Sequence, residues 1–253
     1  MEVKKITSAK NEYIKKIAKL SSKKARDEEG LFVAEGEHLV EMVLSSDFEV
    51  QAIVVSESYF EKNTIDFEKE VILIPDSIFE KISDTKTPQG ILAVVLVPDL
   101  KMKINAGNYI YCDNVQDPGN VGTIIRTADA FSFDGVIMSK GSADIYSSKV
   151  IRSSQGSVFN IKIIKDADAE FLKGVKESFK LTSTALYGEC VNLKEMKVFN
   201  NHIFVIGNEG SGVSQEILEM SDEIVYIPMT GKAESLNAGV AASILMYEVT
   251  SRE

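Results

Sequence analysis

Short apolar runs recur along the chain, and longer amphipathic stretches separate them. The runs are rich in Val and Ile, which predicts buried strands. These strands are expected at 31–34, 50–55, 71–74, 91–97, 109–112, 135–138, 158–164, 181–185, 203–206 and 224–227. The stretches between them predict helices at 8–20, 37–44, 76–82, 120–131, 146–153, 167–179, 214–220 and 236–250. The alternation indicates an α/β fold class with parallel crossover units.

A polar segment led by Pro98 separates two apolar strands and is the best candidate for a linker. We expect a smaller α/β domain over residues 1–98, a linker over 99–107 and a longer α/β domain over 108–253. A chain of 253 residues is long enough for two domains, each with its own core.

The net charge of −10 argues against indiscriminate binding to nucleic acid, but the charge is unevenly distributed. Residues 1–26 carry nine Lys or Arg and two Glu, a net +7, whereas the remainder carries −17. A basic arm on an acidic body suits a polyanion that is contacted locally. The alternative is a solvated terminal helix that binds no partner.

The chain contains no apolar run long enough to cross a membrane, and its first residues lack an apolar signal core. Cys112 and Cys190 lie in or beside apolar stretches, which predicts reduced thiols in a cytoplasmic protein. The only histidines are His38 and His202, so we expect no zinc site with mixed Cys and His ligands.

The first of three polar segments rich in Gly and Asn follows the strand predicted at 109–112. Asn120 suits the N-cap of the next helix, because its side-chain oxygen can accept a free backbone N–H. Arg126 lies near the second helical turn, where a guanidinium can bind a phosphate beside the entering loop. Asp117 is explained equally well as a turn residue or as a site residue.

The second segment spans residues 206–212. Its glycines, Gly207, Gly210 and Gly212, remove side chains where the backbone must approach a ligand. Their spacing differs from the dinucleotide-binding fingerprint, which has glycine at the first, third and sixth positions. Glu209 would repel a phosphate and better suits a ligand with a positive charge, or with hydroxyl and amino donors.

The third segment spans residues 227–237, where Pro228 ends a strand and Gly231 turns the chain. Ser235 and Asn237 stand at the start of the helix predicted at 236–250. A cap at Ser235 explains the helix, but it does not explain why both polar residues are present.

A further segment, residues 147–157, mixes cations with hydroxyls and glycine. Lys149 and Arg152 are three residues apart and share a helix face. Contact with a phosphate and an exposed basic helix end explain this pattern about equally well.

Together the three main segments resemble the SpoU (TrmH-like) family of RNA ribose 2′-O-methyltransferases, within the SPOUT class. The first fits the pattern N-x-x-D-x-x-N-x-G-x-x-x-R-x-A from Asn114 to Ala128. The others fit through Gly207, Glu209, Gly210 and Gly212, and through Ile227, Pro228, Gly231, Ser235, Leu236 and Asn237. This match covers about residues 108–250. Residues 32–36 and 87–90 are similar to the family's substrate-binding domain.

The resemblance implies a parallel-sheet methyltransferase domain with a C-terminal trefoil knot, and a smaller N-terminal α/β domain that binds RNA. It also implies S-adenosyl-L-methionine as cofactor, no metal ion, and a homodimer whose active site lies near the subunit interface. The expected cofactor-binding residues are Gly207, Asn208, Gly210, Ile227, Met229 and Leu236. The expected RNA-binding residues are Arg26, Glu35, Lys149 and Arg152.

The implied reaction transfers a methyl group from a sulfonium to a ribose 2′-oxygen. Arg126 is the expected main catalytic residue, and it would hold a neighbouring phosphate and stabilise charge on the 2′-oxygen. A role as general base is not expected without special surroundings, because a protonated guanidinium is a poor base. The expected catalytic set also includes Asn120, which would hold the Arg126 loop and the ribose, and Glu209, which would help to order the site. Ser235 and Asn237 complete it, and they would contact the substrate or fix the Gly-rich loops. Ribosomal RNA is favoured over transfer RNA because of the separate N-terminal domain.

Three other functions compete with this hypothesis. The glycine spacing opposes a nucleotide-dependent oxidoreductase. A base methyltransferase with a cysteine nucleophile is opposed by the absence of cysteine from the Gly-rich segments. A non-catalytic RNA-binding protein that keeps the fold is opposed by the complete set of polar residues.

Overall fold

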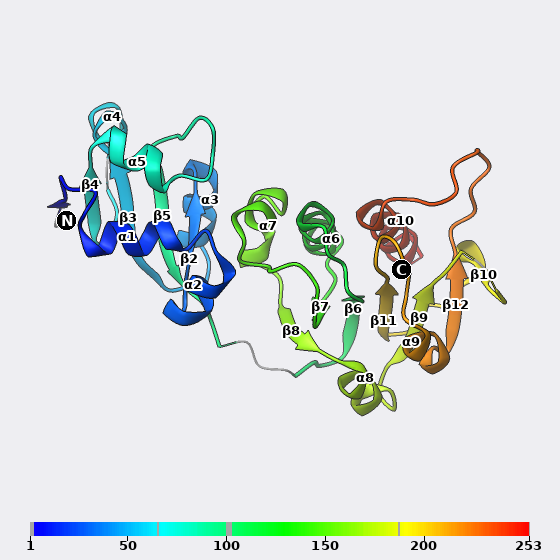
Figure 1. Ribbon diagram of the computed structural model, residues 1–253. Coiled ribbons are helices and arrows are strands. Elements are labelled where there is room, and N and C mark those ends of the chain that lie inside the picture. Colours follow the sequence, from blue (N-terminus) through cyan, green and yellow to red (C-terminus); the bar gives the residue numbers. More distant parts are fainter. Residues whose placement is uncertain (1–2, 65, 100–102, 187, 253) are drawn as a thin grey trace. The chain divides into compact units, whose positions relative to one another are not determined.

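The computed structural model describes residues 3–64, 66–99, 103–186 and 188–252. They form two compact units, most of whose elements are labelled in Figure 1. The first unit contains the residues up to Asp99 together with the distant segment Tyr146–Phe159. The second contains the segment that ends at Ile145 and the residues from Asn160 onward. Residues 100–102 of the expected linker lie outside the described residues.

In the described residues of the first unit, five strands form a sheet in the order β1-β4-β3-β5-β2. They are β1 (Val3–Lys5), β2 (Leu31–Glu35), β3 (Val50–Ser56), β4 (Val71–Ile74) and β5 (Ile91–Leu96). β5 pairs antiparallel with β2 and β3, whereas β4 pairs parallel with β1 and β3. The helices are α1 (Glu12–Lys19), α2 (Lys23–Glu29), α3 (Glu37–Leu44), α4 (Glu57–Lys62), α5 (Asp76–Ile82) and α7 (Ser148–Ser153).

An aromatic cluster joins the segment Tyr146–Phe159 to the rest of the first unit. The ring of Phe32 on β2 stacks on that of Tyr146, with centroids 4.6 Å apart, and lies 6.3 Å from the ring of Phe159. Phe48 meets the rings of Tyr146 and Phe159 edge-on. Such rings bury large apolar areas, so this cluster helps to hold α7 on the first unit.

The described part of the second unit has a seven-stranded sheet in the order β10-β12-β9-β11-β6-β7-β8. Every pairing in it is parallel. The strands are β6 (Gly107–Cys112), β7 (Gly135–Ser139), β8 (Ile163–Ala167), β9 (Lys180–Thr184), β10 (Val191–Asn192), β11 (Asn201–Ile206) and β12 (Glu223–Tyr226). This confirms the predicted α/β fold class with a parallel sheet.

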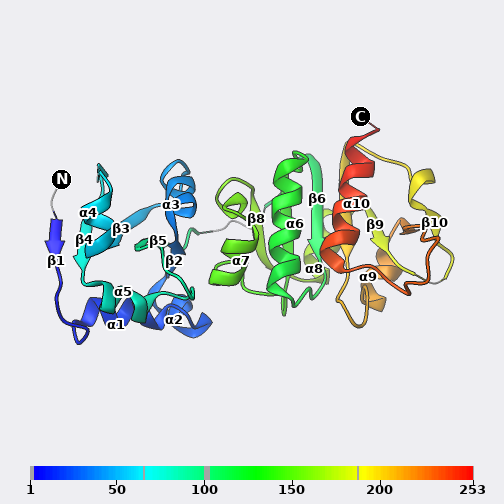
Figure 2. The same ribbon diagram turned by 90° about the horizontal axis from the view of Figure 1, so that it is seen from above.

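Helices cover both faces of this sheet. α6 (Pro118–Ala130) and α10 (Ala238–Thr250) lie over one face, and α8 (Ala169–Val175) and α9 (Gln215–Met220) lie over the other (Figure 1). α6 and α10 run side by side (Figure 2), where the Thr127 and Ser243 hydroxyl oxygens are 3.0 Å apart. A sheet buried on both faces explains why its strands are nearly continuous apolar runs.

Sheet order identifies where this unit can bind a ligand. From β6 the chain adds β7 and β8 in one direction, then places β9 and β11 on the other side of β6. In parallel α/β sheets, ligands bind at the carboxyl ends of the strands near such a reversal. The first and second Gly-rich segments follow β6 and β11, which are neighbours in the sheet.

Some element boundaries differ from the prediction. Residues 158–164 were predicted as one strand, but Ser157–Phe159 forms a 3-10 turn and β8 begins at Ile163. The segment therefore serves both units, since the turn belongs to the first and β8 to the second. β1, α2, α4 and β10 are short elements that the apolar pattern did not predict.

His202 on β11 is fully buried within the parallel sheet. Its Nε2 lies 2.7 Å from the hydroxyl oxygen of Thr182, and its ring stacks on that of Phe204 with centroids 4.0 Å apart. Burial, together with the Lys180 ammonium, lowers the pKa of His202 to about 4, although Asp222 opposes the shift. The imidazole is therefore neutral in the folded protein at neutral pH.

We predict that His202 makes folding sensitive to mild acid. The unfolded imidazole takes up a proton near its ordinary pKa, whereas the folded one does so only near pH 4, so stability is complete above about pH 6.5 and falls as the pH drops. Urea unfolding should show a loss of about 2 kcal/mol at pH 5 relative to pH 7.5. In His202→Gln this loss should largely disappear; an equal loss in the two proteins would contradict the assignment.

Candidate active site

A cavity of about 430 Å³ opens in the second unit among the loops that follow β9, β11 and β12. The start of α10 completes its wall. All six residues predicted to bind the cofactor line this cavity: Gly207, Asn208, Gly210, Ile227, Met229 and Leu236. Glu209 and Ser235, predicted as catalytic residues, line it as well. The structure thus brings together residues from the second and third Gly-rich segments.

The loop after β11 is tightly folded on itself. The backbone groups of Asn208 and Gly212 exchange two hydrogen bonds, of 3.0 and 2.9 Å. The side-chain oxygen of Asn208 accepts the backbone N–H groups of Gly210 and Ser211. A Cβ at Gly207 would lie 2.1 Å from the backbone of Gly212 and Val213, so this position requires glycine.

A chain of side-chain hydrogen bonds joins the three Gly-rich segments. Glu209 accepts the Asn120 side-chain amide at 2.8 Å and the backbone N–H groups of Gln116 and Asp117 at 3.3 and 3.2 Å. Asn237 in turn donates its side-chain amide to the side-chain oxygen of Asn120 at 2.7 Å. The loop after β11 is thereby tied to the starts of α6 and α10.

The charge of Glu209 is stabilised within this chain. Partial burial raises the pKa of the carboxyl, but hydrogen bonds from the Asn120 amide and from the backbone outweigh it, so the pKa lies below its ordinary value. Glu209 is therefore ionised at neutral pH. It presents a negative charge at the cavity wall, which favours a cationic ligand.

Two helix caps differ from the prediction. Asp117, not Asn120, caps α6, because its side chain accepts the backbone N–H of Asn120 at 2.9 Å. Asn237, not Ser235, caps α10 by accepting the backbone N–H of Val240 at 3.2 Å. These caps release the Asn120 side chain for Glu209 and leave Ser235 on the cavity wall.

Arg126 stands apart from this hydrogen-bonded chain. It lies on an exposed position of α6, and its guanidinium makes no hydrogen bond or ion pair with any residue that the structure describes. The structure thus connects Asn120, Glu209 and Asn237 but leaves Arg126 available for a partner outside the chain.

Part of the cavity wall was not predicted from the sequence. Thr184, Ala185 and Leu186, at the end of β9, also line the cavity, and 47% of Leu186 is exposed. β9 lies between β11 and β12 in the sheet, although it precedes both in the chain. No local motif marks this position, so only the sheet order could have identified it.

The four residues predicted to bind RNA lie in the first unit and divide into two pairs. Arg26 is buried and donates to the backbone oxygens of Leu20 and Ser21, and the buried Glu35 holds the loop after α5. Lys149 and Arg152 lie on α7, where Lys149 is exposed and Arg152 is partly exposed. Of the four, only Lys149 and Arg152 are therefore exposed enough to contact an RNA phosphate.

The basic arm is less cationic than its composition predicts. Its lysines pair with nearby acids as Lys4–Glu70, Lys5–Glu57, Lys15–Glu12, Lys16–Glu29, Lys23–Asp27 and Lys24–Glu28. Exposed ion pairs of this kind contribute little stability, but they offset much of the local positive charge. The expected +7 field around residues 1–26 is therefore weaker than the charge count indicates.

The described residues do not favour a metal site, a membrane span or a cysteine nucleophile. Within the described ranges, no cluster of three or more His, Cys, Asp or Glu residues could hold a metal ion. The described helices include none that is long and apolar enough to span a membrane. Burial raises the pKa of the Cys112 and Cys190 thiols, which disfavours a cysteine nucleophile at neutral pH.

A parallel α/β sheet with a loop-walled cavity at its strand ends is typical of a domain that binds a small-molecule ligand. The model of the SpoU rRNA Methylase family matches residues 107–247, and that of the MRM3-like substrate binding domain matches residues 11–93. The chain belongs to the SpoU rRNA methylase family. The resemblance and the N-terminal substrate-binding domain predicted from the sequence are thus confirmed.

Individual relatives agree with this assignment. RlmP of Bacillus subtilis, a 23S rRNA (guanosine(2553)-2′-O)-methyltransferase, is 38% identical over 248 residues, covering 98% of this chain and 99% of that protein. The structure of an AdoMet-bound rRNA methyltransferase from Sinorhizobium meliloti is 29% identical, with a TM-score of 0.86 and 99% and 98% coverage. A Porphyromonas gingivalis structure assigned to the TrmH family is 32% identical, with a TM-score of 0.85 and 95% and 97% coverage.

We predict that Gly207→Ala destabilises the second unit. The added Cβ would overlap the backbone of Gly212 and Val213, which costs about 1–3 kcal/mol of unfolding free energy. Gly210→Ala is the matched control, because its Cβ would approach only the Asn208 side-chain oxygen, at 3.5 Å, and should cost less than about 0.5 kcal/mol. Chemical denaturation measures both values; equal effects would show that the loop is not tightly folded.

Proposed function

We propose that this protein is an S-adenosyl-L-methionine-dependent RNA ribose 2′-O-methyltransferase that acts on ribosomal RNA. The observation that carries the proposal is the cavity walled by the second and third Gly-rich segments and tied through Glu209 to the segment that bears Arg126. The names of relatives such as RlmP favour ribosomal RNA. Transfer RNA is the alternative substrate, and the test below includes it.

The cavity residues fit the proposed cofactor. A volume of about 430 Å³ is within the range of small-molecule sites. Ile227, Met229 and Leu236 give apolar walls for an adenine ring, and the loop backbone around Gly207 gives polar groups for its edge and for the ribose. The ionised Glu209 favours a cofactor that carries a sulfonium and an ammonium.

When bound, the cofactor supplies an electrophilic methyl group. The protein must then hold the ribose hydroxyl in line with that methyl group and stabilise the charge that develops as the hydroxyl loses its proton. We assign this electrostatic role to Arg126, whose free guanidinium can also hold the phosphate next to the reacting ribose. Since arginine stays protonated, we propose that it stabilises charge and does not act as the general base.

The remaining catalytic candidates position the site. Asn120 and Glu209 hold the loop before α6 against the loop after β11, and Asn237 fixes Asn120 to the start of α10. Ser235 is not joined to this chain and lines the cavity, so we propose that its hydroxyl contacts the cofactor or the substrate. The hydrogen bonds orient the polar groups of the site before the reaction begins. Little free energy is then needed to reorient them in the transition state.

We propose that the first unit selects the RNA. Its proposed core is residues 1–98, and Lys149 and Arg152 on α7 add cations that suit RNA phosphates. An RNA substrate also favours a cytoplasmic location, in agreement with the expectation from the cysteines.

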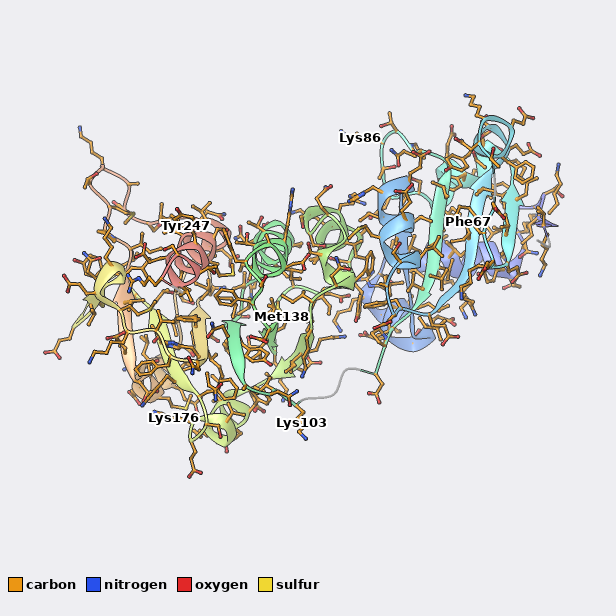
Figure 3. The ribbon with its side chains drawn as sticks, turned by 180° about the vertical axis from the view of Figure 1, so that it is seen from behind. Phe67, Lys86, Lys103, Met138, Lys176 and Tyr247 are labelled. Carbon is orange, nitrogen blue, oxygen red and sulfur yellow. The ribbon has the colours of Figure 1, made fainter. Side chains whose placement is uncertain are left out.

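We propose further that the protein is a homodimer and that α10 forms part of the interface. Val240, Ile244 and Tyr247 share one face of α10 and are 45%, 37% and 61% exposed, and Tyr247 is labelled in Figure 3. A contiguous apolar face of this kind is typical of a subunit interface. We also propose that the second unit contains the C-terminal trefoil knot that the family resemblance implies.

Arg126→Ala should abolish methyl transfer without emptying the cofactor site. We expect the methylation rate of ribosomal RNA to fall by about 100-fold or more, because one charge-stabilising donor is lost. Cofactor affinity measured by calorimetry should stay within about twofold, since Arg126 does not line the cavity. Lys173→Ala on α8 is the control.

Three outcomes of this test would count against the proposal. Full activity of Arg126→Ala would remove Arg126 from the mechanism. Methylation of transfer RNA alone would replace the substrate, and failure of the wild-type protein to bind S-adenosyl-L-methionine would overturn the proposed function.

Tyr247→Asp should convert the dimer to a monomer. A buried carboxylate opposite its own copy would be unpaired and costly at a symmetric interface. Analytical ultracentrifugation would measure the mass, with Val3→Asp on β1 as the control for a new charge at an exposed apolar position. A wild-type protein that sediments as a monomer would contradict the proposal.

A further inference from the structure

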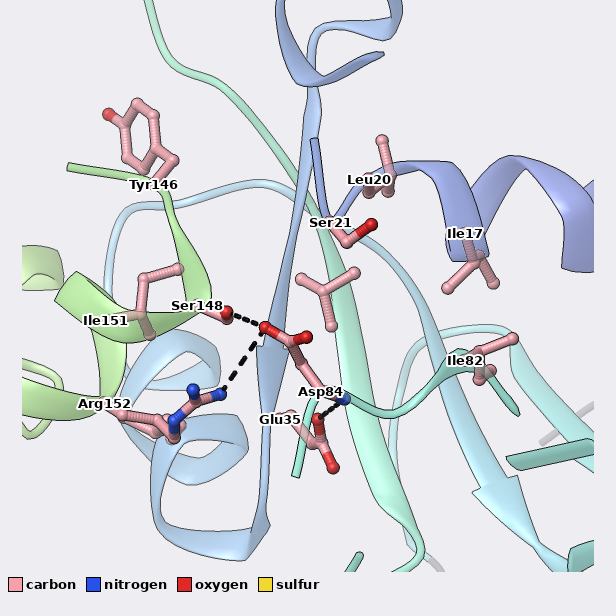
Figure 4. Close-up of a pocket in the computed structure, with 12 residues that line it drawn as sticks. Ile17, Leu20, Ser21, Glu35, Ile82, Asp84, Tyr146, Ser148, Ile151 and Arg152 are labelled. Atoms are coloured by element: carbon pink, nitrogen blue, oxygen red, sulfur yellow. Dashed lines mark hydrogen bonds and ion pairs between the residues drawn. The ribbon is translucent and has the colours of Figure 1, made fainter. Parts of the chain in front are cut away.

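A polar cluster in the first unit joins α7 to the loop after α5 and lies outside the candidate active site. The carboxylate of Asp84 accepts a hydrogen bond from the Ser148 hydroxyl, and its Oδ2 lies 4.0 Å from Nη1 of Arg152 (Figure 4). The side chains of Arg152 and Asp84 are 37% and 50% exposed, so solvent reaches both side chains, although Nη1 of Arg152 itself is buried.

The loop that carries Asp84 is fixed by a second carboxylate. The buried Glu35 accepts the backbone N–H of Asp84 at 3.0 Å and the Thr85 hydroxyl at 2.8 Å, and it also accepts the Ser83 hydroxyl. The loop therefore keeps its position through Glu35, and the Asp84 side chain is not needed to hold it. That side chain instead extends to α7.

Asp84 does not fill the hydrogen-bonding capacity of the Arg152 guanidinium. Its Nη1 is buried but donates no hydrogen bond to any described residue, and the ion pair with Asp84 is long. A guanidinium is best matched by a bidentate oxyanion, and a phosphate group supplies more acceptor oxygens in a better geometry than this carboxylate does. Ser148 adds a hydroxyl donor on the same side of Asp84, as Figure 4 shows.

We propose that Ser148 and Arg152 form a binding site for an RNA backbone phosphate, and that Asp84 occupies this site while RNA is absent. The inference rests on the proposed function. Asp84 acts as an internal competitor: the phosphate must displace its carboxylate from the hydroxyl and the guanidinium. Competition of this kind lowers affinity for any polyanion and so disfavours non-specific RNA.

The test measures RNA binding by full-length protein over a range of salt concentrations, with a fluorescein-labelled RNA hairpin as probe. Asp84→Asn removes the competing charge at nearly constant size, so affinity should increase about three- to tenfold. The slope of log K against log salt should stay close to that of the wild-type protein, because Arg152 contacts the phosphate in both bound complexes. Glu61→Gln on α4 removes the same charge away from the site and should leave the affinity nearly unchanged.

Arg152→Gln provides a second, independent readout. It should weaken binding, make the slope about 0.7–0.9 shallower, and cancel the gain of Asp84→Asn in the double variant. If the contact between Asp84 and Arg152 only holds α7 in place, both variants should have a lower thermal midpoint. RNA affinity in both variants, and the salt slope of Arg152→Gln, should then equal those of the wild-type protein, which would overturn the inference. Wild-type protein that neither binds the hairpin nor methylates ribosomal RNA would overturn the proposed function. Unchanged affinity in Asp84→Asn, with methylation intact, would overturn only this proposal.

Discussion

The hydrogen bond between the Glu209 carboxylate and the Asn120 amide is the contact on which the site depends. It connects loops that are 89 residues apart in the chain, and the bond from Asn237 to Asn120 adds the third loop. Because Glu209 accepts three donors, protonating or removing it would leave the Asn120 amide and two backbone N–H groups short of an acceptor. Glu209 thus helps to hold the cavity wall against the start of α6.

This arrangement divides the polar residues into two kinds. One kind forms hydrogen bonds within the protein: Asn120 is bonded to both Glu209 and Asn237. The polar groups of these three residues therefore hold the loops together. Arg126 and Ser235 are not part of that chain and can act on a ligand. A rigid set of mutually bonded residues that holds a few free donors in place is the arrangement that electrostatic catalysis requires.

Much of this could be predicted from the sequence, and the failures have physical causes. Buried parallel strands such as β4 and β11 were predicted because both of their faces are apolar, and the Gly-rich segments indicated the cavity. Thr184–Leu186 were missed because sheet order is not encoded locally. Asn120 was assigned as a cap because cap propensity is local, whereas its partner Glu209 comes from another loop.

The prediction of a strongly cationic arm agreed least with the structure, because a count of cations does not take into account where the acidic residues lie. Six lysines of the basic arm each have a carboxylate within 4.0 Å. Lys149 and Arg152 lie on α7, and the net charge of that part of the chain did not mark it as a cationic surface. Affinity for a polyanion depends on cations that can exchange their present partners for phosphate. A cation with a weak, long ion pair, such as Arg152, makes that exchange at a lower cost than one that is closely paired. RNA recognition is therefore better sought at α7 than along the arm.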